Sequence, residues 1–365
     1  MLDFVLKLVD FINTYSDWKD RLSKPPFCVT TKRKDGYIIF TYTQRGLKNT
    51  SDFSLELVRE CRGIILDETN NFKPVCVPFF KFANYGEFYA DQIDWSTSRV
   101  IEKIDGSLMK VWFGKGKWMV STSGVIDATD ANVGANGLSY MDIFSEAWEQ
   151  SGGDYNMLNT DYTYMFELVS PKTQVVIPQK ETKLYHIGTR NNCTMVEVDD
   201  YVGFEKPTVL AMPTLESVIE AANNLDSYHE GFVVIDNLYR RIKIKSPLYV
   251  TMHHVLGNCT NDKNVLEIIV KGEDYEVLSY FPEHAPIFNK MRHRLEKFIA
   301  DNEMSLSEIQ AATYETRKEL AARVTKTVCP GCLFAVIDGK SPSVRAFVES
   351  LSSDSLHRYL QIQSD

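Results

Sequence analysis

The sequence lacks any long hydrophobic run. No apolar stretch approaches the roughly 20 residues that a helix needs to span a bilayer, so we expect no membrane partner. Residues 1–22 carry apolar side chains at helical spacing, but acidic residues interrupt them. A secretory signal peptide would have an uninterrupted apolar centre, so this segment is predicted to be an amphipathic helix that packs on the protein.

Cysteine is scarce and odd in number. The chain has seven cysteines without regular spacing, so the disulfide framework of a small secreted protein is not predicted and we expect a reducing cytoplasm. Cys329 and Cys332 form the one close pair, in C-P-G-C. A zinc site needs four ligands and no second pair lies nearby, so we interpret them as plain turn cysteines. A redox or metal role is the alternative.

Positive charge is also not in excess. Lys and Arg number 40 against 49 Asp and Glu, which gives a formal net charge of -9. This balance argues against a histone-like protein that binds any nucleic acid through its whole surface. A confined basic groove, or a metal ion that offsets phosphate charge, can still act within an acidic surface. Internal repeats and low-complexity tracts are absent as well.

What the sequence does contain is a change of pattern near residue 248. Before it, short β-branched and aromatic segments alternate with Gly, Asn and Asp turns, and helical spacing is confined to residues 4–22, 139–151 and 214–224. After it, apolar residues recur at helical spacing among Lys, Arg and Glu. We therefore predict an α+β protein with an antiparallel-sheet domain at residues 1–248 and a mainly α-helical domain at 249–365.

One segment of the first domain, RRIKIK, concentrates positive charge. Arg241, Lys243 and Lys245 alternate with Ile242 and Ile244, so in a strand all three cations share one face. Neighbouring cations repel each other unless an anion lies above them, and a phosphate chain is one such anion. The alternative is a solvated edge strand, which often carries lysines to discourage aggregation.

Two other strands each carry a single glutamate in an apolar setting. Glu230 opens EGFVVID, and Glu167 faces away from Phe166 and Leu168 in TYMFELVS. A carboxylate at the mouth of a buried strand is a natural contact for magnesium or for a ribose. Upstream, Arg62 precedes an apolar strand and suits a phosphate, because its guanidinium is planar and always charged.

The segment EKIDGSL places Lys103 two residues before an acid and three before a glycine. Alone this pattern is weak. The ordered set EKIDGSL, YMFELVS, LYHIGTRN, EGFVV and IKIKSP, however, resembles the motifs of the covalent nucleotidyltransferase superfamily, which contains ATP-dependent ligases and mRNA capping enzymes. CRGIILD, FFKFANYGE and the helical tail resemble the branch of RNA ligases of the T4 RNA ligase 1 type. The resemblance implies an ATP-grasp-like ligase fold for the first domain.

The resemblance also implies roles for individual residues. Lys103 would be the nucleophile that forms a phosphoramidate with AMP, and Lys243 and Lys245 would contact the α-phosphate. Glu167 would lie on the ribose side, and Glu230 would handle a metal or activate the lysine. Further contacts to ATP are implied for the residues that match upstream and flanking motif positions: Tyr42, Arg62, Lys81, Glu102 and Gly106. Gly106 would let the backbone approach the nucleotide.

For the metal, the resemblance implies Mg²⁺ or Mn²⁺, bound by Glu230 and by an acid after the last motif, for which Asp274 is preferred to Glu273. The implied partner is RNA with 5′-phosphate and 3′-hydroxyl ends, including cleaved tRNA, in RNA repair of the kind found in bacteriophages. No obligate protein partner is expected.

Three other functions compete with this interpretation. A minimal ATP-dependent DNA nick ligase would prefer a nicked duplex, and a capping guanylyltransferase would retain GMP on Lys103. The helical tail shows no strand series for an oligonucleotide-binding barrel, which argues against both. An RNA-binding module on a decayed ligase fold is the third, and the joint presence of Lys103, Glu167, Glu230 and the paired lysines counts against it.

Overall fold

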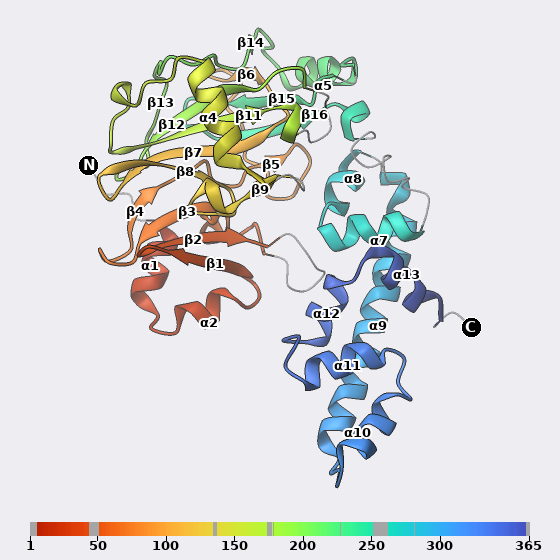
Figure 1. Cartoon of the computed structure of the whole chain (residues 1–365). Helices are drawn as coiled ribbons and strands as arrows, with labels where there is room; N and C mark the ends of the chain where they lie inside the picture. The colour runs from red at the N-terminus through yellow and green to blue at the C-terminus, as the bar shows by residue number, and fades with distance from the viewer. Residues whose placement is uncertain are drawn as a thin grey trace. The chain divides into compact units, whose positions relative to one another are not determined.

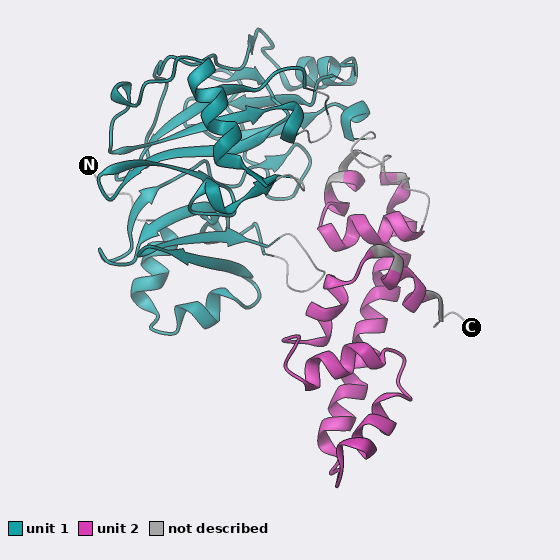
Figure 2. Ribbon diagram, viewed as in Figure 1, with its two compact units in different colours: residues 1–43, 49–253 teal, residues 44–48, 254–365 magenta. Residues whose placement is uncertain are grey.

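A computed structural model describes residues 6–43, 51–133, 137–173, 177, 179–226, 228–250, 262–280 and 282–362. The chain forms two compact units (Figure 2), one from the described residues up to 250 and one from those after 261. The sequence pattern placed its domain boundary after residue 248, close to this division. Within the described part of the chain, the helices are all too short or too polar to cross a membrane.

The first sheet of the larger unit is antiparallel, in the order β1-β2-β3-β4 (Figure 1). Its strands are β1 (Val29–Lys34), β2 (Tyr37–Tyr42), β3 (Arg62–Asp67) and β4 (Lys73–Cys76). Asp35 and Gly36 join β1 to β2 with positive φ angles of 52° and 81°, as a tight two-residue hairpin requires. The Ile38 and Phe40 side chains of β2 pack against α1 (Lys7–Thr14), α2 (Trp18–Leu22) and α3 (Glu56–Glu60).

The single helix expected over residues 4–22 is instead two helices, because Tyr15 adopts an extended backbone after α1. Glu60 of α3 accepts hydrogen bonds from the backbone N–H groups of Lys7 and Leu8, at 2.9 and 2.8 Å. The first backbone N–H groups of a helix have no partner within the helix, so this carboxylate serves as the cap of α1.

Two five-stranded sheets make up the rest of this unit (Figure 1). The second sheet has the order β13-β12-β11-β7-β8, with β13 (Glu197–Val198), β12 (Lys183–Asn191), β11 (Tyr162–Val169), β7 (Ser107–Gly114) and β8 (Lys117–Thr122). The third has the order β14-β6-β15-β16-β5, with β14 (Val209–Leu210), β6 (Arg99–Glu102), β15 (Gly231–Ile235), β16 (Arg241–Lys245) and β5 (Ala83–Asn84). All these pairings are antiparallel except that of β16 with β5.

A helix covers the outer face of each of these two sheets. The second sheet packs on α4 (Tyr140–Gln150), and the third packs on α5 (Leu215–Asn223). Alternation along each strand sends one set of side chains to the helix and the other to the space between the sheets. A short hairpin of β9 (Asn132–Val133) and β10 (Leu138–Ser139) precedes α4.

The regular secondary structure in the described residues of the smaller unit is all helical, which confirms the α+β class with C-terminal helices. Its helices are α7 (Asp262–Lys271), α8 (Asp274–Tyr280), α9 (Ala285–Ala311), α10 (Arg317–Val324), α11 (Pro330–Ile337), α12 (Val344–Ser350) and α13 (Ser353–Ile362). They enclose one apolar core, and both cysteines of C-P-G-C are buried in it as free thiols at the start of α11.

Candidate active site

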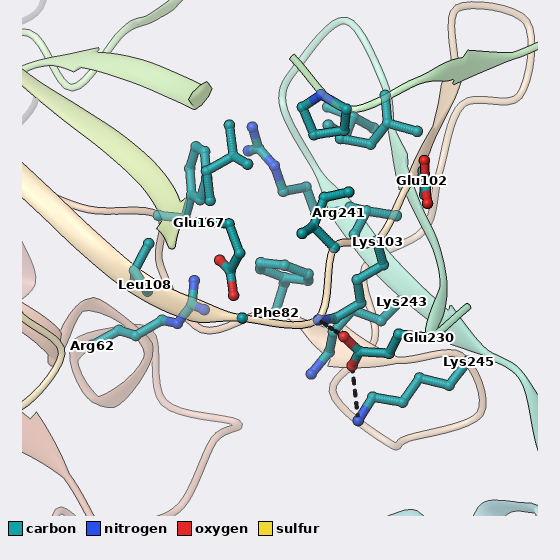
Figure 3. Close-up of a pocket in the computed structure, with 18 of the residues that line it drawn as sticks. Arg62, Phe82, Glu102, Lys103, Leu108, Glu167, Glu230, Arg241, Lys243 and Lys245 are labelled. Carbon is teal, nitrogen blue, oxygen red and sulfur yellow. Dashed lines mark hydrogen bonds and ion pairs between the residues drawn. The ribbon is translucent and has the colours of Figure 1, made fainter. Parts of the chain in front are cut away.

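A cavity of about 340 Å³ lies between the second and third sheets of the larger unit (Figure 3). The third sheet lines it through β6, β15 and β16, the second through β7, β11 and β12, and Arg62 of β3 reaches it from the first. Nine residues singled out in the sequence therefore meet around one space: Arg62, Glu102, Lys103, Gly106, Glu167, Glu230, Arg241, Lys243 and Lys245.

Lys103 and Glu230 face each other at this cavity. Lys103 Nζ donates a hydrogen bond to Glu230 Oε2 at 2.6 Å, and Lys245 Nζ lies 3.4 Å from Glu230 Oε1 (Figure 3). Glu230 is only 4% exposed, whereas the Lys103 side chain retains 22% of its surface. A carboxylate this deeply buried needs charged partners, and the two lysines supply them on its two oxygens.

Strand pairing explains why these residues meet. The backbone N–H of Lys103 donates to the carbonyl of Gly231 at 2.9 Å, which extends the antiparallel pairing of β6 with β15. Gly231 has φ +142°, and a Cβ at this position would lie 2.3 Å from the carbonyl oxygen of Ile244. The glycine of EGFVV is thus required by close contact between strands, and it places Glu230 opposite Lys103.

The strand β16 shows the alternation expected from RRIKIK. Ile242 and Ile244 are buried in the core beneath α5, and Lys243 and Lys245 line the cavity on the other face. Arg241 lies on the same face, but its Nη1 and Nη2 both bind Glu197, and its guanidinium stacks on a phenylalanine ring. A residue can therefore share the cationic face and still serve the packing of the fold.

Glu167 faces the cavity from β11, while its neighbours Phe166 and Leu168 pack toward α4. Burial raises the pKa of Glu167 to about 7. Glu230 adds to this rise, and Lys103 and Arg62 oppose it. The carboxyl group of Glu167 accordingly exchanges its proton near neutral pH.

This pKa gives a testable stability effect. Because the folded pKa of Glu167 lies above its ordinary value of 4.5, the folded protein binds an extra proton between about pH 4.5 and 7, and stability falls as pH rises through that window. Glu167→Gln should therefore have a higher melting temperature than wild type at pH 8, where its free energy of unfolding is larger by roughly 1–3 kcal/mol. At pH 4.5 the two proteins should melt at about the same temperature. Thermal unfolding of ligand-free protein from pH 4.5 to 8 measures this.

Glu60, whose pKa burial also raises to about 7, titrates in both proteins, so the difference between them isolates Glu167. A stabilisation that is the same at both ends of the pH range would show that the glutamine acts by packing rather than by loss of the ionisable group.

The guanidinium of Arg62 has one nitrogen that no other group of the protein hydrogen-bonds. Its Nη1 is buried and makes no hydrogen bond, and its guanidinium lies 5.5 Å from the centre of the Phe82 ring. Buried donors without a partner are rare in folded proteins. The side chain reaches the cavity (Figure 3), so an anionic oxygen of a ligand fits this position.

Sequence reasoning missed one residue next to this arginine. Lys110 of β7 is fully buried and donates to the carbonyl of Gly63, and burial lowers its pKa. A lysine within the apolar run LMKVWF was the available signal. Its bond holds the backbone directly after Arg62, so Lys110 helps to set the position of that guanidinium.

Gly106 lines the cavity, but the structure gives a different reason for it. A Cβ at Gly106 would lie 2.5 Å from the carbonyl oxygen of Leu168, so the glycine is required by close packing of the loop on β11. Approach to the nucleotide was the expected reason. The adjacent Asp105 holds the loop, because it accepts hydrogen bonds from the Ile177 backbone and the Tyr249 hydroxyl.

Two predicted ATP contacts lie outside the residues that line this cavity. Lys81 Nζ lies 5.2 Å from the ring centre of Tyr42 and 4.8 Å from that of Phe53. These are cation–π contacts within the first sheet's surroundings. The structure therefore places Tyr42 and Lys81 next to each other, and neither residue is in the lining of the cavity.

The structure does not support Asp274 as a metal ligand. Asp274 lies in the helical unit, is 2% exposed and pairs with Arg292. It is also not among the residues that line the cavity, whereas Glu230 is. Among the described residues, no three or more His, Cys, Asp or Glu side chains form a group that could hold a metal.

A lysine paired with a buried glutamate lies with two more lysines and an arginine around one cavity between antiparallel sheets, which is the kind of site that the resemblance to nucleotidyltransferases implies. The comparisons with known proteins agree. The model of the RNA ligase family of the T4 RNA ligase 1 type matches residues 60–249, which is just over half of the chain. The chain therefore belongs to this family of RNA ligases.

Individual relatives are distant. An RNA ligase of Rhodothermus phage RM378 is 25% identical, over 82% of this chain and 86% of the relative. A putative bifunctional polynucleotide kinase/RNA ligase of Autographa californica nuclear polyhedrosis virus is 29% identical, over 62% of this chain and 35% of the relative. Among solved structures, a putative ATP-dependent DNA ligase from Aquifex aeolicus has a TM-score of 0.48 at 11% identity, covering 86% of each chain. An archaeal ATP-dependent RNA ligase has a TM-score of 0.44 at 12% identity, covering 80% of this chain and 82% of that one.

Proposed function

We propose that Lys103 carries one adenylate temporarily while the enzyme joins a 5′-phosphate to a 3′-hydroxyl in RNA. The observation that supports this most directly is the 2.6 Å contact between Lys103 Nζ and Glu230, in a cavity that also presents Lys243 and Lys245. An amine attacks phosphorus only after it loses a proton, and Glu230 Oε2 lies where it can accept one.

The adenylate moves in three transfers. Lys103 Nζ first attacks the α-phosphorus of ATP, so that an N–P bond forms and the bond to pyrophosphate breaks. An oxygen of the RNA 5′-phosphate then attacks the same phosphorus, which breaks the N–P bond and returns the amine. Finally the 3′-hydroxyl attacks the activated 5′-phosphorus and AMP leaves.

The residues of the cavity fit ATP. Lys243 and Lys245 would neutralise negative charge on the phosphoryl group during the first two transfers, and the buried Nη1 of Arg62 offers a donor to an anionic oxygen. Glu167, from the opposite sheet, would accept hydrogen bonds from the ribose hydroxyls. Glu102 lies at the rim, directly before the nucleophile.

A divalent metal, which we propose to be Mg²⁺ or Mn²⁺, fits this cavity with Glu230 as its protein ligand. It would supply further neutralisation of the triphosphate charge. Mg²⁺ is usually held by one or two carboxylates together with substrate phosphates and water, and a single buried glutamate is consistent with that mode.

We also propose a role in RNA repair, with cleaved tRNA among the substrates. The name of the baculovirus relative couples RNA ligase to polynucleotide kinase, and a kinase of that class can supply the 5′-phosphate that ligation consumes. The reducing cytoplasm expected from the cysteines stays a prediction.

Radiolabelled ATP tests the proposal. With label on the α-phosphate, wild-type enzyme and Mg²⁺ should give a protein-bound adenylate that is stable to base and labile to acid, as a P–N bond is. Label on the γ-phosphate should be released. The loaded enzyme should then seal 5′-phosphorylated single-stranded RNA in preference to nicked duplex DNA. Loading by GTP instead would indicate a capping enzyme, and preference for the DNA nick would indicate a DNA ligase.

A further inference from the structure

A second cavity, of about 280 Å³, opens beside the first. Both cavities are lined by Glu102, Lys103, Ile104 and Glu230, so the proposed nucleophile lies where they adjoin. The transfers of the adenylate give no role to the second cavity. Any RNA end that reacts must nevertheless reach the phosphorus near Lys103, and this cavity leads there.

Two tyrosines give the second cavity surfaces on which a base can stack. Tyr228 is 64% exposed and Tyr185 is half-buried, and both line the space. A large aromatic side chain that is mostly exposed at the edge of a catalytic cavity is unusual for packing, and it is common where single-stranded nucleic acid binds. His229 follows Tyr228 and pairs with Asp226 at 2.7 Å, which holds this segment in place.

Charge distinguishes the two cavities. The first presents Arg62, Lys243 and Lys245 toward its ligand. The second is lined by four acidic residues, Glu102, Asp105, Glu181 and Glu230, and by two lysines, Lys103 and Lys180. A strand end that carries a terminal phosphate is favoured in the first cavity. An uncharged end with hydroxyl donors is favoured in the second, because carboxylates accept hydrogen bonds from hydroxyls.

We propose that the second cavity binds the terminal nucleoside of the RNA strand that supplies the 3′-hydroxyl. Its base stacks on Tyr228 and its 2′,3′-diol donates to carboxylates that include Glu181. The inference rests on the proposed three-transfer reaction. In the last transfer, a bond forms between O3′ and the activated 5′-phosphorus, the bond from that phosphorus to AMP breaks, and the hydroxyl proton passes to solvent.

The diol gives the site a means to distinguish RNA from DNA. A terminal ribose presents two adjacent hydroxyls, whereas a terminal deoxyribose presents one. A site built to accept both hydrogen bonds discriminates against the strand that lacks one, because its acceptor is then left desolvated and unpaired.

The test uses full-length enzyme and a pre-adenylated RNA strand, so that only the last transfer is measured. Tyr228→Ala should raise the KM for a 3′-hydroxyl RNA strand by roughly 5- to 100-fold, and Tyr228→Phe should restore it. Glu181→Gln should reduce the preference of the enzyme for a 3′-terminal ribonucleotide over a 3′-terminal 2′-deoxynucleotide. Lys117→Ala, at the start of β8 and outside the lining of both cavities, serves as the matched control and should change neither quantity.

The same variants are assayed for formation of the Lys103 adenylate. Adenylate formation by Tyr228→Ala and Glu181→Gln at the wild-type ATP dependence, with the acceptor defects above, supports the proposal. An increase in the KM for ATP would overturn it and assign the cavity to the nucleotide, and so would unchanged acceptor kinetics in both variants. Absence of any adenylate on the wild-type enzyme would instead refute the proposed function.

Discussion

Lys103→Ala will abolish formation of the protein-bound adenylate, a loss limited only by the detection of label from α-labelled ATP. The amine at this position is the atom that attacks phosphorus, and alanine has no nucleophile to replace it. Lys103→Arg should fail as well, because arginine retains the charge that pairs with Glu230 but stays protonated and does not attack. Lys117→Ala removes an exposed lysine from the same domain and should label normally.

A misfolded variant would also fail to label, so the decisive control bypasses the first two transfers. When the RNA strand is supplied already adenylated, Lys103→Ala should still seal it, because the last transfer forms no bond to the lysine. Persistent labelling of Lys103→Ala would identify another residue as the nucleophile. Loss of sealing with pre-adenylated RNA would mean that the substitution damages the site as a whole.

Lys243→Ala and Lys245→Ala should each slow adenylate formation by about 10²- to 10³-fold. Both side chains line the cavity from one face of β16, where they can neutralise charge that develops as pyrophosphate leaves. Stabilisation that acts mainly in the transition state changes the rate more than substrate binding. Single-turnover rates measured across a range of ATP concentrations separate the two effects.

The two lysines differ in one respect that the same experiment can detect. Lys245 Nζ lies 3.4 Å from Glu230 Oε1, so its removal leaves Lys103 as the remaining close cation that pairs with this buried carboxylate. The rate of Lys245→Ala should therefore fall further than that of Lys243→Ala, because this substitution also unbalances the charge around Glu230. If both variants form the adenylate at the wild-type rate, the lysines of β16 have no role in the reaction, and β16 is a solvated strand that carries lysines.

Much of the site was predictable because its residues lie on short strands with clear alternation. The period of two in RRIKIK correctly separated the isoleucines from the lysines, and the same rule placed Glu167 opposite Phe166 and Leu168. Each of these inferences depends on residues that are neighbours in sequence. The helical texture after residue 248 was readable for the same reason.

Residues whose role depends on a distant partner were interpreted less well. Arg241 has the same local pattern as the lysines, yet Glu197 of another sheet binds it. Asp274 has a side chain of the type that binds metals, but it forms an ion pair with Arg292 of the next helix. The role of the buried Lys110 was missed, because its partner, the carbonyl of Gly63, belongs to a different strand pair.

The sequence by itself determined the order of the charged side chains along the strands and the face of each strand on which they lie, because local spacing sets these properties. The tertiary structure alone decided which charges pair with one another and which line the cavity. Pairing depends on contacts such as Lys103 with Glu230, 127 residues apart, and spacing along the chain does not encode the distance between such residues in the fold.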